Sequence, residues 1–163
     1  MMVSFKIFQI FLLVLVMVTL AACGSQSTED HAAHGGAHSG DLQETTSSIN
    51  TLPKFLKNQP EQTQQIYQIA GLSMDKLQWI PCYCGCGDEV GHKSNKNCFI
   101  KEVKSDGSVV WDDHGTRCGV CMQIALTTAQ LSKDGKAIKE IRNIIDTQYN
   151  KGYAKPTDTP MPS

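Results

Sequence analysis

The segment Pro81-Cys82-Tyr83-Cys84-Gly85-Cys86-Gly87 places three cysteines at alternate positions of the chain. Alternate side chains of an extended loop point to the same side, so we expect the three sulfur atoms on one face. Cysteines separated by a single residue are badly placed for a relaxed disulfide with one another. The two glycines let the backbone fold closely around an ion. The segment therefore predicts a group of metal ligands.

A second cysteine pair lies at Cys118-Gly119-Val120-Cys121, in the first turn of an expected helix. The positive end of a helix dipole stabilises thiolates and lowers their pKa, which favours both metal ligation and thiol exchange. Another cysteine and two histidines lie close to these segments in the sequence. The candidate metal ligands are Cys82, Cys84, Cys86, Cys118, Cys121, Cys98, His92 and His114.

These six cysteines leave three interpretations open. Thiolate-rich sites favour Cu(I) and Zn(II), which predicts a copper or zinc protein. Three disulfides in an exported domain would instead make an interaction module, although the crowding of Cys82, Cys84 and Cys86 argues against it. In the third interpretation Cys118 and Cys121 are catalytic in thiol-disulfide exchange, where one attacks a substrate disulfide and the other resolves it. A binding role is favoured over an enzyme, and the enzyme question stays open.

The residues around the cysteine segments predict a mostly helical α+β domain. Apolar periodicity, prolines and glycines predict helices over 60–71, 76–80 and 117–131, and a last amphipathic helix from Ile138 to Gly152. Asp106-Gly107 separates two β-branched runs, which is typical of a hairpin turn. We therefore expect a small helical domain with one β-hairpin between two cysteine-rich segments.

The N-terminus has the character of an export signal. Its apolar run over 7–20 is shorter than the roughly 20 residues that span a bilayer. Leu20-Ala21-Ala22-Cys23 resembles the lipobox of bacterial lipoproteins, in which the cysteine receives a diacylglycerol and becomes the new N-terminus. The resemblance implies a signal peptide over 1–22, lipidation of Cys23, and anchoring on the extracytoplasmic face of a bacterial cell membrane.

Composition divides the rest of the chain. Residues 23–51 are rich in Ser, Thr and Gly and predict a flexible tether, whereas 52–154 predict the folded domain and 155–163 a disordered tail. The tether carries His31, His34 and His38, three imidazoles that can close weakly around Cu(II), Ni(II) or Zn(II). A polar spacer whose histidines bind nothing is the alternative.

Charge and motifs exclude several classes of function. With 15 Lys+Arg against 16 Asp+Glu, the formal net charge is -1, which gives no basis for nucleic-acid binding. No serine-histidine pairing, paired-carboxylate motif or phosphate-binding glycine loop supports a hydrolase or a nucleotide enzyme. The predicted partner is the membrane, through the lipid anchor, and the sequence predicts no particular protein partner.

Three stretches carry a resemblance to a known family: residues 81–87, Gly91-His92-Lys93-Ser94-Asn95, and Trp111-Asp112-Asp113-His114-Gly115-Thr116-Arg117-Cys118-Gly119-Val120-Cys121. In them the chain resembles the PCYCGC-motif lipoproteins, over nearly all of the mature protein. That family has no established activity, so the resemblance implies lipidation and a cysteine cluster that acts as one unit.

Two partial resemblances suggest other roles. The Cys84-Gly85-Cys86 and Cys118-Gly119-Val120-Cys121 spacing is similar to that of bacterioferritin-associated ferredoxin domains, which implies a [2Fe–2S] cluster in a helical fold. Such clusters are assembled in the cytoplasm, so an iron-sulfur cluster is less expected in an exported chain. Residues 117–149 are similar to the thiol reductants of cytochrome c maturation, which implies extracytoplasmic exchange.

Overall fold

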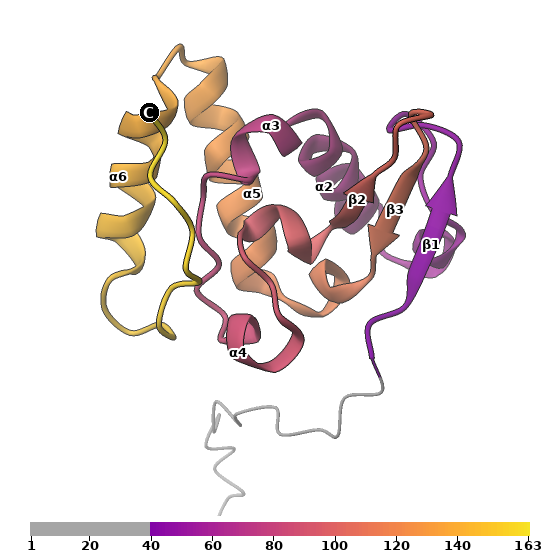
Figure 1. Cartoon of the computed structure of the whole chain (residues 1–163), viewed down its shortest axis with the longest axis horizontal. Helices are drawn as coiled ribbons and strands as arrows, with labels where there is room; N and C mark the ends of the chain where they lie inside the picture. Colours follow the sequence, from indigo (N-terminus) through magenta and orange to yellow (C-terminus); the bar gives the residue numbers. More distant parts are fainter. Residues whose placement is uncertain (1–39) are drawn as a thin grey trace, which may run out of the picture. The chain divides into compact units, whose positions relative to one another are not determined.

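The computed structural model describes residues 40–163 of the chain (Figure 1). Five α-helices, three 3-10 helices and three strands occur in this part. In chain order they are β1 (Gln43–Thr46), η1 (Lys54–Asn58), α2 (Glu61–Leu72), α3 (Met74–Leu77), α4 (Cys86–Val90), η2 (Asn95–Cys98), β2 (Ile100–Val103), β3 (Val109–Asp112), η3 (His114–Arg117), α5 (Gly119–Lys133) and α6 (Ile138–Tyr149). The mostly helical α+β fold predicted from the sequence is confirmed.

The sheet has three antiparallel strands in the order β1-β3-β2. The predicted hairpin is β2-β3, and Gly107 supplies the left-handed turn conformation at φ 84°. Strand β1 lies inside the segment expected to be a tether, 23–51. It is ordered because it pairs along β3, with Gln43 opposite Asp112, and because the Glu44 carboxylate accepts the N–H of Lys54 at 2.8 Å.

Helices α2, α5 and α6 follow the predicted ranges closely, whereas α3 lies at Met74–Leu77 instead of 76–80, and one α-helix is an addition. Pro60 precedes α2, and Gly135 ends α5 with φ 81°. The addition is α4, which begins at Cys86 where the sequence analysis expected an extended loop. Gly85, at φ 92°, turns the chain into this short helix. Cys86 therefore reaches the other sulfur atoms from a helical turn.

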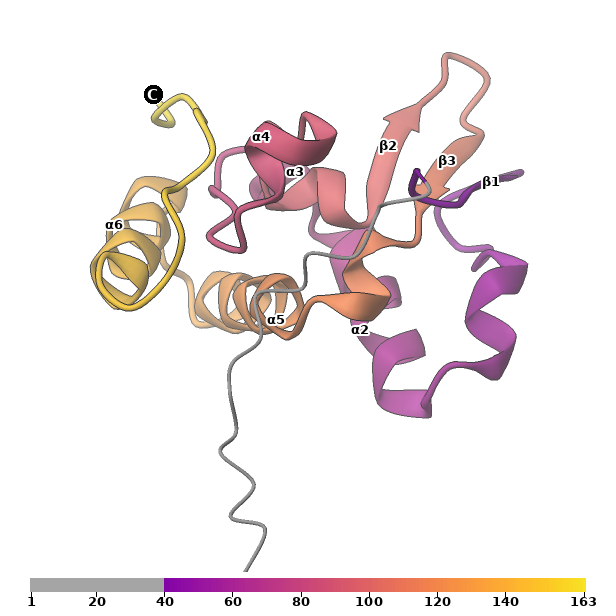
Figure 2. The same ribbon diagram turned by 90° about the horizontal axis from the view of Figure 1, so that it is seen from below.

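Two apolar clusters flank α5, which lies between α2 and α6 (Figure 2). The first is built around Tyr67, Phe99 and Trp111, and the cysteines of the site belong to it. The hydroxyl of Tyr67 donates to the carbonyl of Asp112 at 2.8 Å, which joins α2 to the sheet. In the second cluster the isoleucines of α6 pack on Ile124 of α5. The site thus belongs to only one of the two clusters.

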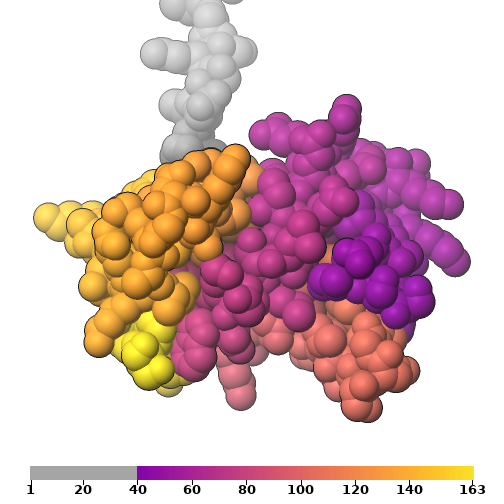
Figure 3. All heavy atoms as spheres, turned by 90° about the horizontal axis from the view of Figure 1, so that it is seen from above, coloured from indigo at the N-terminus to yellow at the C-terminus, as the bar shows by residue number. Residues whose placement is uncertain are grey.

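The C-terminal segment differs from the expected disordered tail over 155–163. It lies on the magenta part of the chain (Figure 3), where the N–H of Cys82 donates to the Thr157 hydroxyl at 2.9 Å. The N–H of Thr157 in turn donates to the Cys82 carbonyl at 3.0 Å. The side chain of Arg142 donates to the carbonyls of Thr159 and Pro160, both at 3.2 Å. These bonds order a segment whose prolines predict the opposite.

Within residues 40–163, no helix combines the length and the apolar character that crossing a bilayer requires.

Candidate metal centre

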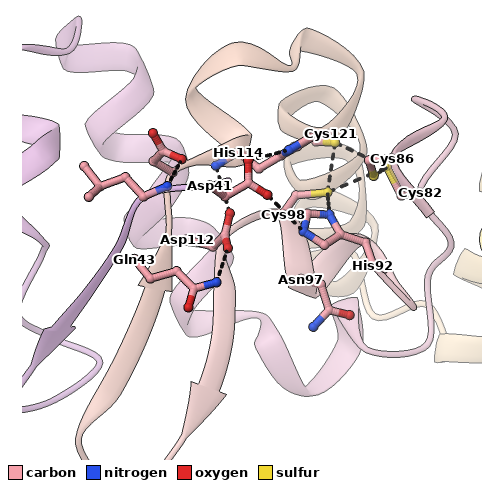
Figure 4. Close-up of polar contacts among 12 residues, drawn as sticks. Asp41, Gln43, Cys82, Cys86, His92, Asn97, Cys98, Asp112, His114 and Cys121 are labelled. Atoms are coloured by element: carbon pink, nitrogen blue, oxygen red, sulfur yellow. Dashed lines mark hydrogen bonds and ion pairs between the residues drawn. The ribbon is translucent and has the colours of Figure 1, made fainter. Parts of the chain in front are cut away.

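The six cysteines of the described region lie together where the loop before α4, η2 and the start of α5 meet. In Figure 4 the side chains of Cys82, Cys86, Cys98 and Cys121 point toward one another. All six thiols are free, so no disulfide forms within residues 40–163. Cys82, Cys86, Cys98 and Cys121 are buried, whereas Cys84 and Cys118 are half-buried. One side of the cluster is therefore open to an incoming ion.

The spacing of the sulfur atoms suits shared coordination. Cys121 Sγ lies 3.0 Å from Cys98 Sγ, 3.3 Å from Cys82 Sγ and 3.7 Å from Cys84 Sγ. Cys82 Sγ is also 3.1 Å from Cys84 and 3.4 Å from Cys86. A Zn–S bond of about 2.3 Å gives a tetrahedron whose sulfurs are about 3.8 Å apart. The cluster can hold a metal ion after a small expansion.

Backbone contacts hold the cysteines in place. The Cys118 sulfur accepts the N–H of Cys121 at 3.3 Å and so caps α5. The side-chain amide of Asn95 donates to the Cys121 carbonyl at 3.2 Å. Gly115 allows η3 to approach Phe99, because a Cβ there would lie 2.7 Å from the Phe99 ring. The two cysteine segments are thus fixed to each other through η2 and η3.

Both candidate histidines lie at the edge of the cluster. His92 Nδ1 is 3.7 Å from Cys98 Sγ, and His114 Nε2 is 4.0 Å from Cys84 Sγ. The centroids of the two rings are 4.8 Å apart. Groups of three ligand atoms within 4.8 Å of one another include Cys86, His92 and His114. All eight predicted ligands therefore meet in one region.

Sequence reasoning missed Asp41, which contacts both histidines on the side away from the thiols (Figure 4). Its Oδ1 lies 3.1 Å from His114 Nδ1 and its Oδ2 lies 3.8 Å from His92 Nε2. Arg117 also pairs with this carboxylate at 2.7 Å. Asp41 falls in the expected tether, and only the pairing of β1 with β3 brings it to the site.

The comparisons with known proteins give one match. The family model described as a protein of unknown function with PCYCGC motif matches residues 12–162. The chain belongs to the PCYCGC family. The resemblance seen in the sequence is thereby confirmed. Neither the curated proteins nor the solved structures contain a match.

Charge is unevenly distributed over the thiols of this PCYCGC domain. Hydrogen bonds from neighbouring thiols, above all Cys118, hold the pKa of Cys84 well below its usual range. His114 forms a hydrogen bond with Cys84. This bond, with a further contribution from Asp41, raises the pKa of His114 to about 9. Burial raises the pKa of Cys98. Without metal, these shifts favour a thiolate at Cys84 beside an imidazolium at His114, and a protonated thiol at buried Cys98.

The Cys118/Cys121 pair differs from the expectation of lowered pKa values. A hydrogen bond with Cys121 lowers the pKa of Cys118. Three effects outweigh it and raise this pKa to about 12: the hydrogen bond with Cys84, burial, and the negative charge of Cys84. Hydrogen bonds with neighbouring thiols, first of all Cys118, also raise the pKa of Cys121. In the PCYCGC domain, the neighbouring sulfurs therefore affect the pKa values of Cys118 and Cys121 more strongly than the helix dipole does.

Four predicted residues of this PCYCGC protein cannot be placed. Cys23, His31, His34 and His38 lie outside the described residues, so lipidation and capture of metal by the tether stay predictions.

Proposed function

We propose that the PCYCGC domain binds a soft or borderline metal ion, Cu(I) or Zn(II), through its cysteine cluster. The observation that carries this proposal is the position of Cys121 Sγ, within 3.0–3.7 Å of the sulfurs of Cys82, Cys84 and Cys98. A disulfide would occupy only one of these neighbours. A metal ion engages several at once, and thiolates are the ligands that Cu(I) and Zn(II) favour.

The proposal places this site outside the cell on a lipid anchor at Cys23. The Leu-Ala-Ala-Cys lipobox supports the anchor. An oxidising compartment converts free thiols to disulfides, and a bound metal protects them from this reaction. In this role a copper-loaded domain hands its ion to a partner, whereas a zinc-loaded domain keeps it as a structural ion.

A second candidate function is thiol-disulfide exchange, favoured by the Cys84 thiolate beside His114. Cys84 is half-buried and therefore reachable by a substrate disulfide. Its attack forms a mixed disulfide and releases a substrate thiolate, and a neighbouring thiol then resolves the intermediate. The raised pKa of Cys118, about 12, argues against Cys118 as the attacking group.

Metal content and thiol count separate these functions. The full chain, purified without oxygen, is analysed for elements and for free thiols, and the Cys84→Ser variant is compared with Ser105→Ala in the hairpin turn. Metal binding predicts copper or zinc in the purified protein, less of it in Cys84→Ser, and no change in Ser105→Ala. A metal-free protein that takes up neither ion when reduced contradicts the proposal. Disulfide reductase activity that Cys84→Ser abolishes supports exchange instead.

A further inference from the structure

We infer that the six thiols hold two metal ions, with Cys82 and Cys121 as thiolates that bridge them. This inference rests on the proposed metal binding and adds its stoichiometry and the roles of the individual cysteines. Two tetrahedral ions need eight ligand positions in all, and six sulfurs fill them when two sulfurs each serve both ions. A single ion would leave two thiols of the cluster without a role.

The sulfur positions form two sets of four that share one edge, and Cys84 and Cys86, which belong to different sets, also lie within 4.8 Å of each other. That edge joins Cys82 Sγ and Cys121 Sγ, which are 3.3 Å apart. On one side, Cys98 Sγ lies 3.0 Å from Cys121 and 3.6 Å from Cys82, and Cys86 Sγ lies 3.4 Å from Cys82. These four sulfurs make up the first ion site, in which Cys82, Cys98 and Cys121 are mutual neighbours and Cys86 joins through Cys82.

The second set lies across the same edge. Cys84 Sγ is 3.1 Å from Cys82 and 3.7 Å from Cys121. The sulfurs of Cys84, Cys118 and Cys121 all lie within 4.8 Å of one another. The second ion site therefore consists of Cys82, Cys121, Cys84 and Cys118, and Cys118 joins it through Cys84 and Cys121. Cys82 and Cys121 each have close neighbours in both sets.

Each histidine has a neighbouring sulfur in a different set, and both also lie within 4.8 Å of Cys86. His92 Nδ1 lies 3.7 Å from Cys98, a terminal sulfur of the first site, and His114 Nε2 lies 4.0 Å from Cys84, a terminal sulfur of the second. Asp41 contacts both imidazoles on the opposite side. Each site thus has a neighbouring imidazole, and the Asp41 carboxylate orients both. Groups placed around metal ligands in this way fix the orientation of the ligands and change their affinity for the metal.

The two sites differ in how far solvent reaches them. Cys86 and Cys98 are 3% and 0% exposed, whereas Cys84 and Cys118 are half-buried. A chelator reaches the second site directly, but it reaches the first only after the domain opens. The two ions should therefore leave in two kinetic steps, with the ion at Cys84 and Cys118 leaving first.

Cadmium-113 tests the inference on the full chain, reduced and loaded without oxygen. We expect two Cd(II) ions per chain by native mass spectrometry and two NMR signals in the thiolate region that couple through the bridging sulfurs. The thiolate shift separates these ions from any held by His31, His34 and His38. One thiolate-bound ion, or two uncoupled signals, overturns the inference and leaves the proposed function standing. No thiolate-bound ion overturns both.

Two isosteric variants test the roles of the cysteines. Cys121→Ser removes a bridge and should abolish both thiolate-bound signals, whereas Cys118→Ser removes a terminal ligand and should keep the signal of the first site. If the two variants lose the same cadmium signals, Cys121 does not bridge the two ions. Circular dichroism checks that each variant folds. If Cys121→Ser does not fold, the coupling between the two signals of the wild-type protein decides whether sulfurs bridge the ions.

Discussion

At the scale of single residues, Cys84 differs from the other cysteines in what surrounds its sulfur atom. Cys98 also contacts a histidine but is fully buried, whereas the Cys84 thiol is half-buried and faces His114 as well as neighbouring sulfurs. The imidazole is held from behind by Asp41, at 3.1 Å. A positive charge beside Cys84 stabilises its thiolate before any metal arrives. Cys84 is therefore suited to be the first ligand that an ion meets.

The pH titration of His114 tests this pairing. Its hydrogen bond with Cys84 raises the His114 pKa to about 9, so the folded protein binds this proton more tightly than the unfolded chain does. The stabilisation is fully present below the unfolded pKa of about 6.5 and is lost as the pH rises through about 9. NMR of the metal-free, reduced protein should show this midpoint, and Cys84→Ser should move it down. An unchanged midpoint in the variant would exclude Cys84 as the cause.

Residue spacing predicted the thiols of the site but not its carboxylate. Cys-x-Cys-x-Cys and Cys-x-x-Cys mark ligands because they bring sulfurs together locally. Asp41 belongs to no such motif. It contacts His92 and His114 only because the strand that follows it, β1, pairs with β3. Proximity that tertiary structure creates between distant segments is invisible to motif spacing.

At the scale of elements, the short helix α4 places Cys86 and depends on the left-handed conformation of Gly85. Gly85→Ala should destabilise the fold by about 1 kcal/mol, because an L-residue pays to adopt this conformation. The strain also tilts α4, so metal affinity should fall with stability. Urea unfolding and metal titration measure the two effects.

Gly119→Ala provides the matched control for this prediction. Gly119 also neighbours a cysteine, but its φ is not positive and a Cβ there would have nothing within 4 Å. This variant should keep its stability and its metal. Equal behaviour of the two variants would show that the conformation of Gly85 does not matter.

The C-terminal segment makes a second prediction at this scale. Thr157→Val removes the hydroxyl that accepts the N–H of Cys82 and leaves that buried donor unpaired, which costs about 1–3 kcal/mol. Stability in urea and metal affinity should both decrease. Thr147→Val, on the exposed side of α6, is the control. A metal affinity equal to wild type would mean that the tail does not position Cys82.

Periodicity predicted long elements better than short ones. The isoleucines that define α6 recur at helical spacing, and their burial against α5 gives that pattern its physical basis. Strand β1 is mostly polar and forms because β3 offers it an edge. The tail is ordered by threonine hydroxyls that bond to distant backbone. Such elements depend on partners that local sequence does not reveal.

At the scale of the whole molecule, metal removal should affect one apolar cluster more than the other. Cys82, Cys98 and Cys121 belong to the cluster around Trp111, whereas the cluster on α6 contains no cysteine. Hydrogen exchange should therefore rise in α4, η2 and the first turn of α5 after chelation under reducing conditions. Exchange in α6 should stay close to that of the loaded protein. A uniform rise along the chain would contradict this prediction.

The bonds between Thr157 and Cys82 also bear on the order of events when the protein is made. The cysteines are synthesised before Thr157, so the backbone of Cys82 gains its final hydrogen bonds only when the last part of the chain has emerged. A product truncated before Thr157 keeps all six thiols of the cluster but lacks these two bonds, so its Cys82 backbone is held less firmly than in the full chain.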